Sequence, residues 1–159
     1  MERCISFRLA KIPPEGERYR GVVSGDILAL SGDVEYTSVD EVSYDLFVQE
    51  VSDRFIVKGS LWTRVKFICV RCAVEGMLNV KVSDFRAAKE LEKDSEYVDL
   101  TQDIREAIIL AFPGYPVCRS GCMGLCPQCG KNLNEGQCEC EPQRDSRWSA
   151  LDELGLMEE

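Results

Sequence analysis

The residues with the clearest chemistry in this chain are its cysteines. Six of the nine lie in one Gly- and Asn-rich stretch, residues 118–140, and another pair, Cys69 and Cys72, lies upstream in FICVRCAVEG. The chain has no histidine, so thiolates are the only soft ligands that it offers to a metal. Tetrahedral zinc takes four such ligands, and a Cys-x2-Cys turn supplies two of them from one tight loop. We therefore interpret eight of the cysteines as ligands of two structural zinc ions.

The eight cysteines can be divided into two four-thiolate sites in two ways. In the first division, site 1 is Cys69, Cys72, Cys118 and Cys122, and site 2 is Cys126, Cys129, Cys138 and Cys140. In the second division, Cys69 and Cys72 join Cys126 and Cys129 as in a zinc ribbon, and the other four form their own site. We favour the first division because its site 2 closes within fifteen residues, and a short loop costs less closure entropy than a long one. Cys4 lies apart from every motif and is expected to be a buried or free thiol.

These sites are expected to be structural, and we predict no catalytic residues and no enzymatic activity. A catalytic zinc usually keeps one position for water, whereas every ligand here is a thiolate and no general base lies nearby in the sequence. Arg71, Arg119 and Lys131 can be interpreted as RNA contacts. We favour the alternative that they offset thiolate charge and hydrogen-bond to sulfur.

The composition limits the cellular compartments in which the chain is expected and the kinds of partner that it can bind. The cysteine count is odd and no signal-peptide pattern is recognisable, so a disulfide framework is disfavoured and a reducing, cytoplasmic location is expected. No apolar run approaches membrane-spanning length. The net charge is −9, which suits a basic protein partner better than a phosphate backbone.

The elements that must position these cysteines are mainly strands. Alternating apolar residues predict strands within residues 4–12, 42–67 and 77–85. The last two of these flank CVRC, which places Cys69 and Cys72 at the tip of a β-hairpin. Residues 16–21 are expected to form a solvated loop, and residues 86–99 a charged turn of helix or connector.

A helix is predicted at about residues 99–112, where apolar residues recur at helical spacing. Asp99 and Gln102 fit a capping box, and Pro113 and Gly114 end the helix. A short terminal helix is expected to carry Trp148, Leu151 and Leu154 on one stripe. The fold class is therefore α+β. We expect an antiparallel β domain with one packed long helix at residues 1–117 and a cysteine-rich zinc module at residues 118–159.

The chain resembles the YceD-type large ribosomal RNA subunit accumulation proteins. The resemblance rests on CVRC in a hairpin, LAFPGYPVC, GLCPQCGKNLNEGQCEC and DSRWSALDEL, and covers the C-terminal two thirds in detail. It implies a role in the accumulation of large-subunit ribosomal RNA, hence in ribosome biogenesis, without an established enzymatic activity.

Three functions follow in order of preference. The first is a zinc-stabilised factor that binds a ribosomal protein or a large-subunit ribosomal precursor. The second is a direct RNA-binding protein that uses Arg64, Lys66, Arg71, Arg119 and Lys131. The third is a thiol redox enzyme that uses a Cys-x2-Cys pair, which would require an exposed thiolate of low pKa. No membrane and no small-molecule substrate are expected.

Overall fold

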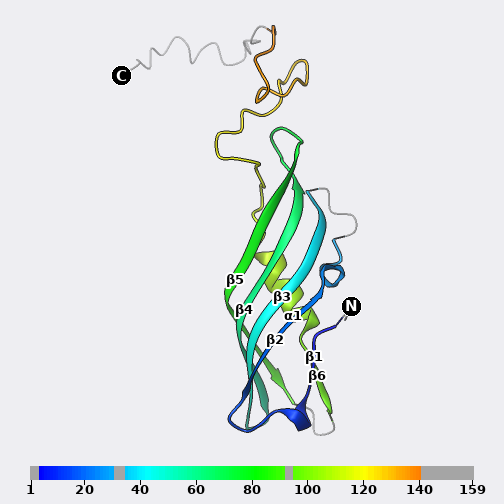
Figure 1. The fold of residues 1–159 in the computed structure, drawn as a ribbon, viewed down its shortest axis with the longest axis vertical. Coiled ribbons are helices and arrows are strands. Elements are labelled where there is room, and N and C mark those ends of the chain that lie inside the picture. The colour runs from blue at the N-terminus through cyan, green and yellow to red at the C-terminus, as the bar shows by residue number, and fades with distance from the viewer. Residues whose placement is uncertain (1–3, 31–34, 92–94, 141–159) are drawn as a thin grey trace, which may run out of the picture.

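The fold is built around one long, four-stranded antiparallel sheet (Figure 1). A computed structural model describes residues 4–30, 35–91 and 95–140. The sheet order is β2-β3-β4-β5, with β2 at Glu17–Ser24, β3 at Tyr36–Val51, β4 at Arg54–Ile68 and β5 at Glu75–Glu90. A small second sheet pairs β1 (Ser6–Arg8) with β6 (Tyr97–Asp99), and the remaining elements are η1 (Leu9–Lys11), η2 (Gly25–Leu28) and helix α1 (Thr101–Leu110). The α+β prediction is confirmed.

The alternation of apolar and polar residues along β4 explains the two different faces of the sheet. Every second side chain is buried, as with Val57, Leu61 and Val65, while Lys58, Trp62, Arg64 and Lys66 between them are exposed. Successive side chains of a strand point to opposite faces, so this pattern gives one dry and one wet side.

Helix α1 and the small sheet cover the dry face of the large sheet. Ile104 and Ile108 of α1 are buried in the core, and Phe7 of β1 packs against Tyr19 and Phe55 of the large sheet. In Figure 1, α1 lies behind the sheet, and no described element covers the side that faces the viewer. The wet face is therefore open in the described part of the chain.

Helix α1 is shorter than predicted, and the predicted capping box is wrong. The helix spans Thr101–Leu110 rather than residues 99–112. The Asp99 carboxylate does accept a hydrogen bond from the Thr101 N–H, at 2.7 Å. The Gln102 side chain, however, donates to Glu106 one turn further on, at 2.7 Å. The helix does end before Pro113 and Gly114, as predicted.

Strands replace two predicted segments, the solvated loop at residues 16–21 and the charged turn of helix or connector at residues 86–99. Residues 17–21 belong to β2, which pairs with β3 from Glu17↔Val48 to Ser24↔Glu41. Strand β5 continues to Glu90, and Tyr97–Asp99 forms β6. In contrast, the strand predicted within residues 4–12 is limited to Ser6–Arg8, because the chain turns into η1 at Leu9.

The chain that leaves α1 is held against the large sheet. The Tyr36 ring of β3 lies 4.5 Å from the Phe112 ring, between centroids, and its hydroxyl donates to the Pro113 carbonyl. These contacts direct the next residues along the sheet towards the β4–β5 hairpin tip, beyond which the cysteine-rich segment lies (Figure 1). The division into domains at residue 117 stays a prediction, and the predicted terminal helix with Trp148, Leu151 and Leu154 lies outside the described residues.

Candidate metal centres

The first cysteine cluster joins the hairpin tip to the segment that follows α1. Cluster 1 consists of Cys69, Cys72, Cys118 and Cys122. Strands β4 and β5 stay paired up to Ile68↔Glu75, so Cys69 and Cys72 lie in the turn between them. The Val70 N–H donates to the Pro116 carbonyl at 3.0 Å, and this bond brings the second half of the cluster to the tip.

The sulfur atoms of cluster 1 have the spacing of a tetrahedral zinc site. All four lie within 4.8 Å of one another, with 3.9 Å between the sulfurs of Cys69 and Cys122 and 3.7 Å between those of Cys72 and Cys118. A tetrahedron with Zn–S bonds of about 2.3 Å has S···S edges of about 3.8 Å. A disulfide would need about 2.05 Å, and none of the nine cysteines is in a disulfide. The donor set and its spacing therefore fit zinc.

The second cluster is local in sequence. Cluster 2 consists of Cys126, Cys129, Cys138 and Cys140, whose sulfur atoms also lie within 4.8 Å of one another. An isolated β-bridge between Leu125 and Asn132 frames its Cys-x2-Cys turn. The Cys126 N–H donates to the Lys131 carbonyl at 2.8 Å. This cluster therefore needs only one short segment to assemble.

The two clusters use the same backbone turn. In cluster 1 the Ala73 N–H donates to the Cys69 carbonyl at 2.9 Å, and in cluster 2 the Gly130 N–H donates to the Cys126 carbonyl, also at 2.9 Å. The residue after the second cysteine has a positive φ in both turns, 56° at Ala73 and 72° at Gly130. Glycine adopts this conformation without steric cost, whereas alanine does not. The motif CPQCG thus has its expected turn, and CVRCA forms the same turn under strain.

In cluster 1 the backbone lowers the pKa of one thiol. Burial by itself raises the pKa of Cys69, but backbone N–H groups, those of Cys118 and Cys72 first, donate to its sulfur and bring the pKa down to about 6. Burial, together with the neighbouring sulfur of Cys122, raises the pKa of Cys118 to about 12. Closely spaced thiolates cannot all ionise without a counter-charge, which is what a divalent cation supplies.

Cluster 2 has the same asymmetry. The backbone N–H groups of Cys129 and Gln128 lower the pKa of Cys126 to about 6. The Cys129 thiol, and after it burial, raises the pKa of Cys140 to about 12. Both clusters thus contain a stabilised thiolate and a thiol whose deprotonation calls for a positive charge.

Asn134, from the GKNLN stretch, links the two clusters. Its side-chain N–H donates to the Cys122 sulfur of cluster 1 at 3.4 Å, and its side-chain oxygen accepts from the Met123 N–H at 3.0 Å. Asn132 in turn accepts from the Asn134 N–H at 3.1 Å. Partners of this kind orient metal ligands and tune their basicity. Sequence reasoning missed Asn134, although two asparagines beside a Cys-x2-Cys turn were a usable signal.

The cationic side chains near the clusters hydrogen-bond to oxygen atoms of the loops rather than to the sulfur atoms. Arg71 donates to the Cys122 carbonyl at 3.1 Å, Arg119 to the Asn134 side-chain oxygen at 2.8 Å, and Lys131 to the Gln137 carbonyl at 2.8 Å. Within the described chain, the side chains of these three residues form no hydrogen bond to a cysteine sulfur, although the Arg71 backbone N–H does donate to the Cys69 sulfur. The geometry of the three side chains supports a role in holding the loops, and of the predicted hydrogen bonds to sulfur only the one from the Arg71 backbone is seen in the described chain.

The structure gathers the sulfur atoms as the first division grouped them, and not as the second did. Metal ligation by Cys69, Cys72, Cys118, Cys122, Cys126, Cys129, Cys138 and Cys140 stays a prediction. Cys4 is exposed and lies in neither cluster.

The fold and the clusters define a small antiparallel-sheet protein with two four-cysteine centres. A family model described as large ribosomal RNA subunit accumulation protein YceD matches residues 86–155. An uncharacterized protein of Mycobacterium tuberculosis strain H37Rv is 32% identical over 138 residues, covering 76% of this chain and 67% of that protein. The chain therefore belongs to the YceD family.

Plant relatives carry the same family name. The chloroplastic large ribosomal RNA subunit accumulation protein YCED homolog 1 of Arabidopsis thaliana is 33% identical over 58 residues, which are 36% of this chain and 18% of that protein. The maize homolog 1 is 33% identical over 81 residues, or 50% of this chain and 27% of that protein. No solved structure gives a significant match. Among the described residues, no helix has the length and apolar character needed to cross a bilayer.

Proposed function

We propose that each cluster binds one zinc ion, and that both ions are structural. Four thiolates saturate a tetrahedral ion, so no position is left for a water nucleophile. When bound, zinc supplies the charge that keeps four neighbouring sulfurs ionised and contributes folding free energy. The chain itself pre-arranges the ligands through the two Cys-x2-Cys turns and, in cluster 1, through the Asn134 hydrogen bond to Cys122.

We further propose that the protein is a non-enzymatic factor in ribosome biogenesis that supports the accumulation of large-subunit ribosomal RNA. The observation that carries this proposal is the family match over residues 86–155, which include both α1 and cluster 2. The factor acts in the cytoplasm by binding a ribosomal protein or a precursor of the large subunit. The net charge of −9 supports a basic protein as part of that partner.

Depletion of the protein tests the ribosomal role. We expect large-subunit ribosomal RNA to fall relative to small-subunit RNA in depleted cells, and the tagged protein to sediment with large-subunit precursors. Unchanged RNA ratios in depleted cells would reject this role. Elemental analysis of the purified chain tests the metal separately, with two zinc ions per chain expected.

The thiol-redox alternative has less support from the geometry. Each Cys-x2-Cys pair has two further cysteine sulfurs within 4.8 Å, so its thiolates have a metal-binding arrangement rather than that of an isolated redox pair. The zinc-loaded protein should resist alkylation at all eight cluster cysteines and react at Cys4. Rapid alkylation of one Cys-x2-Cys pair with zinc retained would favour the redox alternative.

A further inference from the structure

The open face of the large sheet, on the side away from α1, contains a hollow with an exposed tryptophan. The hollow has a volume of about 1010 Å³, and Trp62 of β4 is among its lining residues. Trp62 is 44% exposed although it lies in the middle of a central strand. Tryptophan is enriched at binding surfaces because its large ring gains much from being covered. This position therefore points to a ligand.

Four cations surround Trp62 on this face, and all are exposed: Lys58, Arg64, Lys66 and Lys81. The first three share the outer side of β4 with Trp62, and Lys81 of β5 is its cross-strand neighbour. None of the four forms an ion pair or a side-chain hydrogen bond with another residue of the described chain. Their charge is therefore available to a partner.

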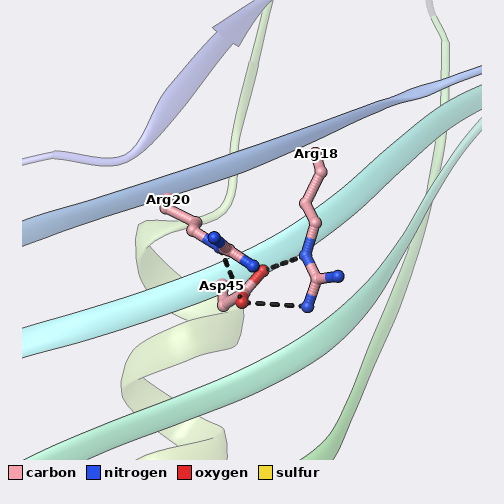
Figure 2. A network of polar contacts seen from close by, with 3 residues as sticks. All are labelled: Arg18, Arg20 and Asp45. Carbon is pink, nitrogen blue, oxygen red and sulfur yellow. Dashed lines mark hydrogen bonds and ion pairs between the residues drawn. The ribbon is translucent and has the colours of Figure 1, made fainter.

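Other cations on the same sheet are already paired with carboxylates. Arg18 and Arg20 of β2 both bind the Asp45 carboxylate of β3 (Figure 2), and the hydrogen bond from Arg18 is the main reason that the pKa of Asp45 lies below its usual value. Arg54 pairs with Glu90, and Arg86 with Asp84.

Acidic residues border one side of the hollow only. Asp40 and Glu41 line it from β3, whereas Arg64, Asn79 and Lys81 line it from β4 and β5. Free positive charge is thus concentrated on the β4–β5 side, around Trp62, in a chain whose net charge is −9.

We propose that Trp62 with Lys58, Arg64, Lys66 and Lys81, here called the β4–β5 face, binds an unpaired segment of RNA. This inference rests on the proposed function, because it names the component of the ribosomal precursor that the protein contacts. Aromatic side chains stack on unpaired bases while neighbouring cations contact phosphates. Side chains on one side of a strand repeat about every 6.6 Å, so an RNA strand along β4 meets several cations in succession.

The chemistry of the face favours unpaired RNA over the other partners. A basic ribosomal protein would be repelled by four free cations, and a duplex offers no free base for stacking. The Asn79 amide, beside Arg64, and the Ser43 and Ser60 hydroxyls add hydrogen-bonding groups within the hollow. Because the whole chain carries a net charge of −9, the surface outside this face is acidic on balance and attracts RNA less.

Tryptophan fluorescence tests the contact directly. The chain has two tryptophans, so in a full-length Trp148→Phe variant all indole emission comes from Trp62. We expect a short single-stranded RNA of mixed sequence to quench this emission, and the same RNA annealed to its complement to bind at least about tenfold more weakly, since stacking is lost. Absence of quenching by RNA that does bind would overturn the proposal, as would equal binding of the duplex.

Paired variants distinguish RNA binding by the β4–β5 face from non-specific electrostatic attraction of RNA to the chain. By fluorescence anisotropy with labelled RNA, Trp62→Ala should lower affinity about tenfold or more, and Trp62→Phe should retain most of it. Arg64→Gln with Lys81→Gln should reduce the slope of log affinity against log salt by about 1.4. The matched control, Arg54→Gln with Arg86→Gln, removes the same charge from already paired cations and should change the slope by much less. Equal effects of the two pairs would overturn the proposal.

Complementation distinguishes failure of this inference from failure of the proposed function. In depleted cells, Trp62→Ala that retains its circular dichroism should restore large-subunit RNA less well than the wild-type chain. Full restoration by this variant would reject the β4–β5 face as the RNA contact and leave the ribosomal role standing. A ribosomal protein that bound this face while RNA did not would also reject it.

Discussion

Clusters 1 and 2 share a turn and a ligand set but differ in what holds them in place. Cluster 1 joins residues 46 and 53 positions apart in the chain, and three of its four cysteines, Cys69, Cys72 and Cys122, are buried with the hydrophobic core. Cluster 2 lies within residues 126–140, and only Cys126 is buried. Zinc in cluster 1 would therefore stabilise the main fold, and zinc in cluster 2 one segment.

The difference matters because closing a long loop costs more entropy than closing a short one. In cluster 1 the sheet, α1 and the Tyr36 contacts with Phe112 and Pro113 have already closed that loop. A metal there locks an existing arrangement. In cluster 2 the chain is organised only by short-range contacts, namely the Cys-x2-Cys turn, the Leu125–Asn132 bridge and a few hydrogen bonds within the same segment, so most of its local order should depend on the ion.

The largest expected effect is the loss of cluster 1. Cys69→Ser should lower the free energy of unfolding by more than about 4 kcal/mol, since loss of a structural metal is among the most destabilising changes known. Urea unfolding followed by circular dichroism measures this effect. The control is Cys4→Ser, an exposed thiol outside both clusters, which should change stability by less than about 0.5 kcal/mol. Equal stability of the two variants would refute a structural metal in cluster 1.

Disruption of cluster 2 should have a smaller and more local effect. Cys129→Ser replaces an exposed ligand and should release one zinc ion per chain, because three remaining thiolates bind more weakly than four. Amide signals from residues 124–140 should collapse in NMR spectra, while those of β3 and β4 stay in place. Loss of the sheet signals as well would show that the two clusters are not separable.

Asn134 tests whether the clusters are coupled. Asn134→Ala removes the hydrogen bond to the Cys122 sulfur and the one from the Met123 N–H. Loss of such a partner typically weakens metal affinity by about 10- to 100-fold, and competition with a chromophoric chelator measures it at cluster 1. Gln137→Ala, an exposed position in the same segment, should leave the affinity unchanged. If both variants bound zinc like the wild type, coupling through Asn134 would be refuted.

The sheet and the Cys-x2-Cys turns were predictable because their signals are local. Buried residues at every second position, such as Val57 and Leu61, follow directly from the pleat, and CPQCG encodes its own turn. Strand β2 was missed because Arg18 and Arg20 face water and only Val23 of this strand is fully buried. The pairing of β2 with β3 depends on the tertiary structure, and no short sequence pattern predicts it.

The site could be predicted only in part, for a related reason. Sequence spacing supported two divisions of the cysteines, and the path of the chain after α1 decides which sulfurs meet. The role of Asn134 depends on that same path. Likewise, the net charge of the chain does not show that Arg18 is paired with Asp45, whereas Arg64 forms no ion pair in the described chain. Position in the fold, rather than residue type, separates the two arginines.

The smallest expected effect comes from exchanging the residues that follow the two Cys-x2-Cys turns. Ala73→Gly should raise the free energy of unfolding by about 0.5 kcal/mol, because glycine relieves the positive φ of 56° at some cost in chain entropy. Gly130→Ala should destabilise cluster 2 by about 1 kcal/mol. A Cβ at Gly130 would meet no atom within 4 Å, so this cost arises from the backbone alone.

Urea unfolding measures the effect of Ala73→Gly, and zinc competition at cluster 2 measures the effect of Gly130→Ala. Stabilisation by Ala73→Gly together with destabilisation by Gly130→Ala would confirm that the two turns are equivalent. If both substitutions were destabilising, the packing of the Ala73 methyl group would outweigh its strain.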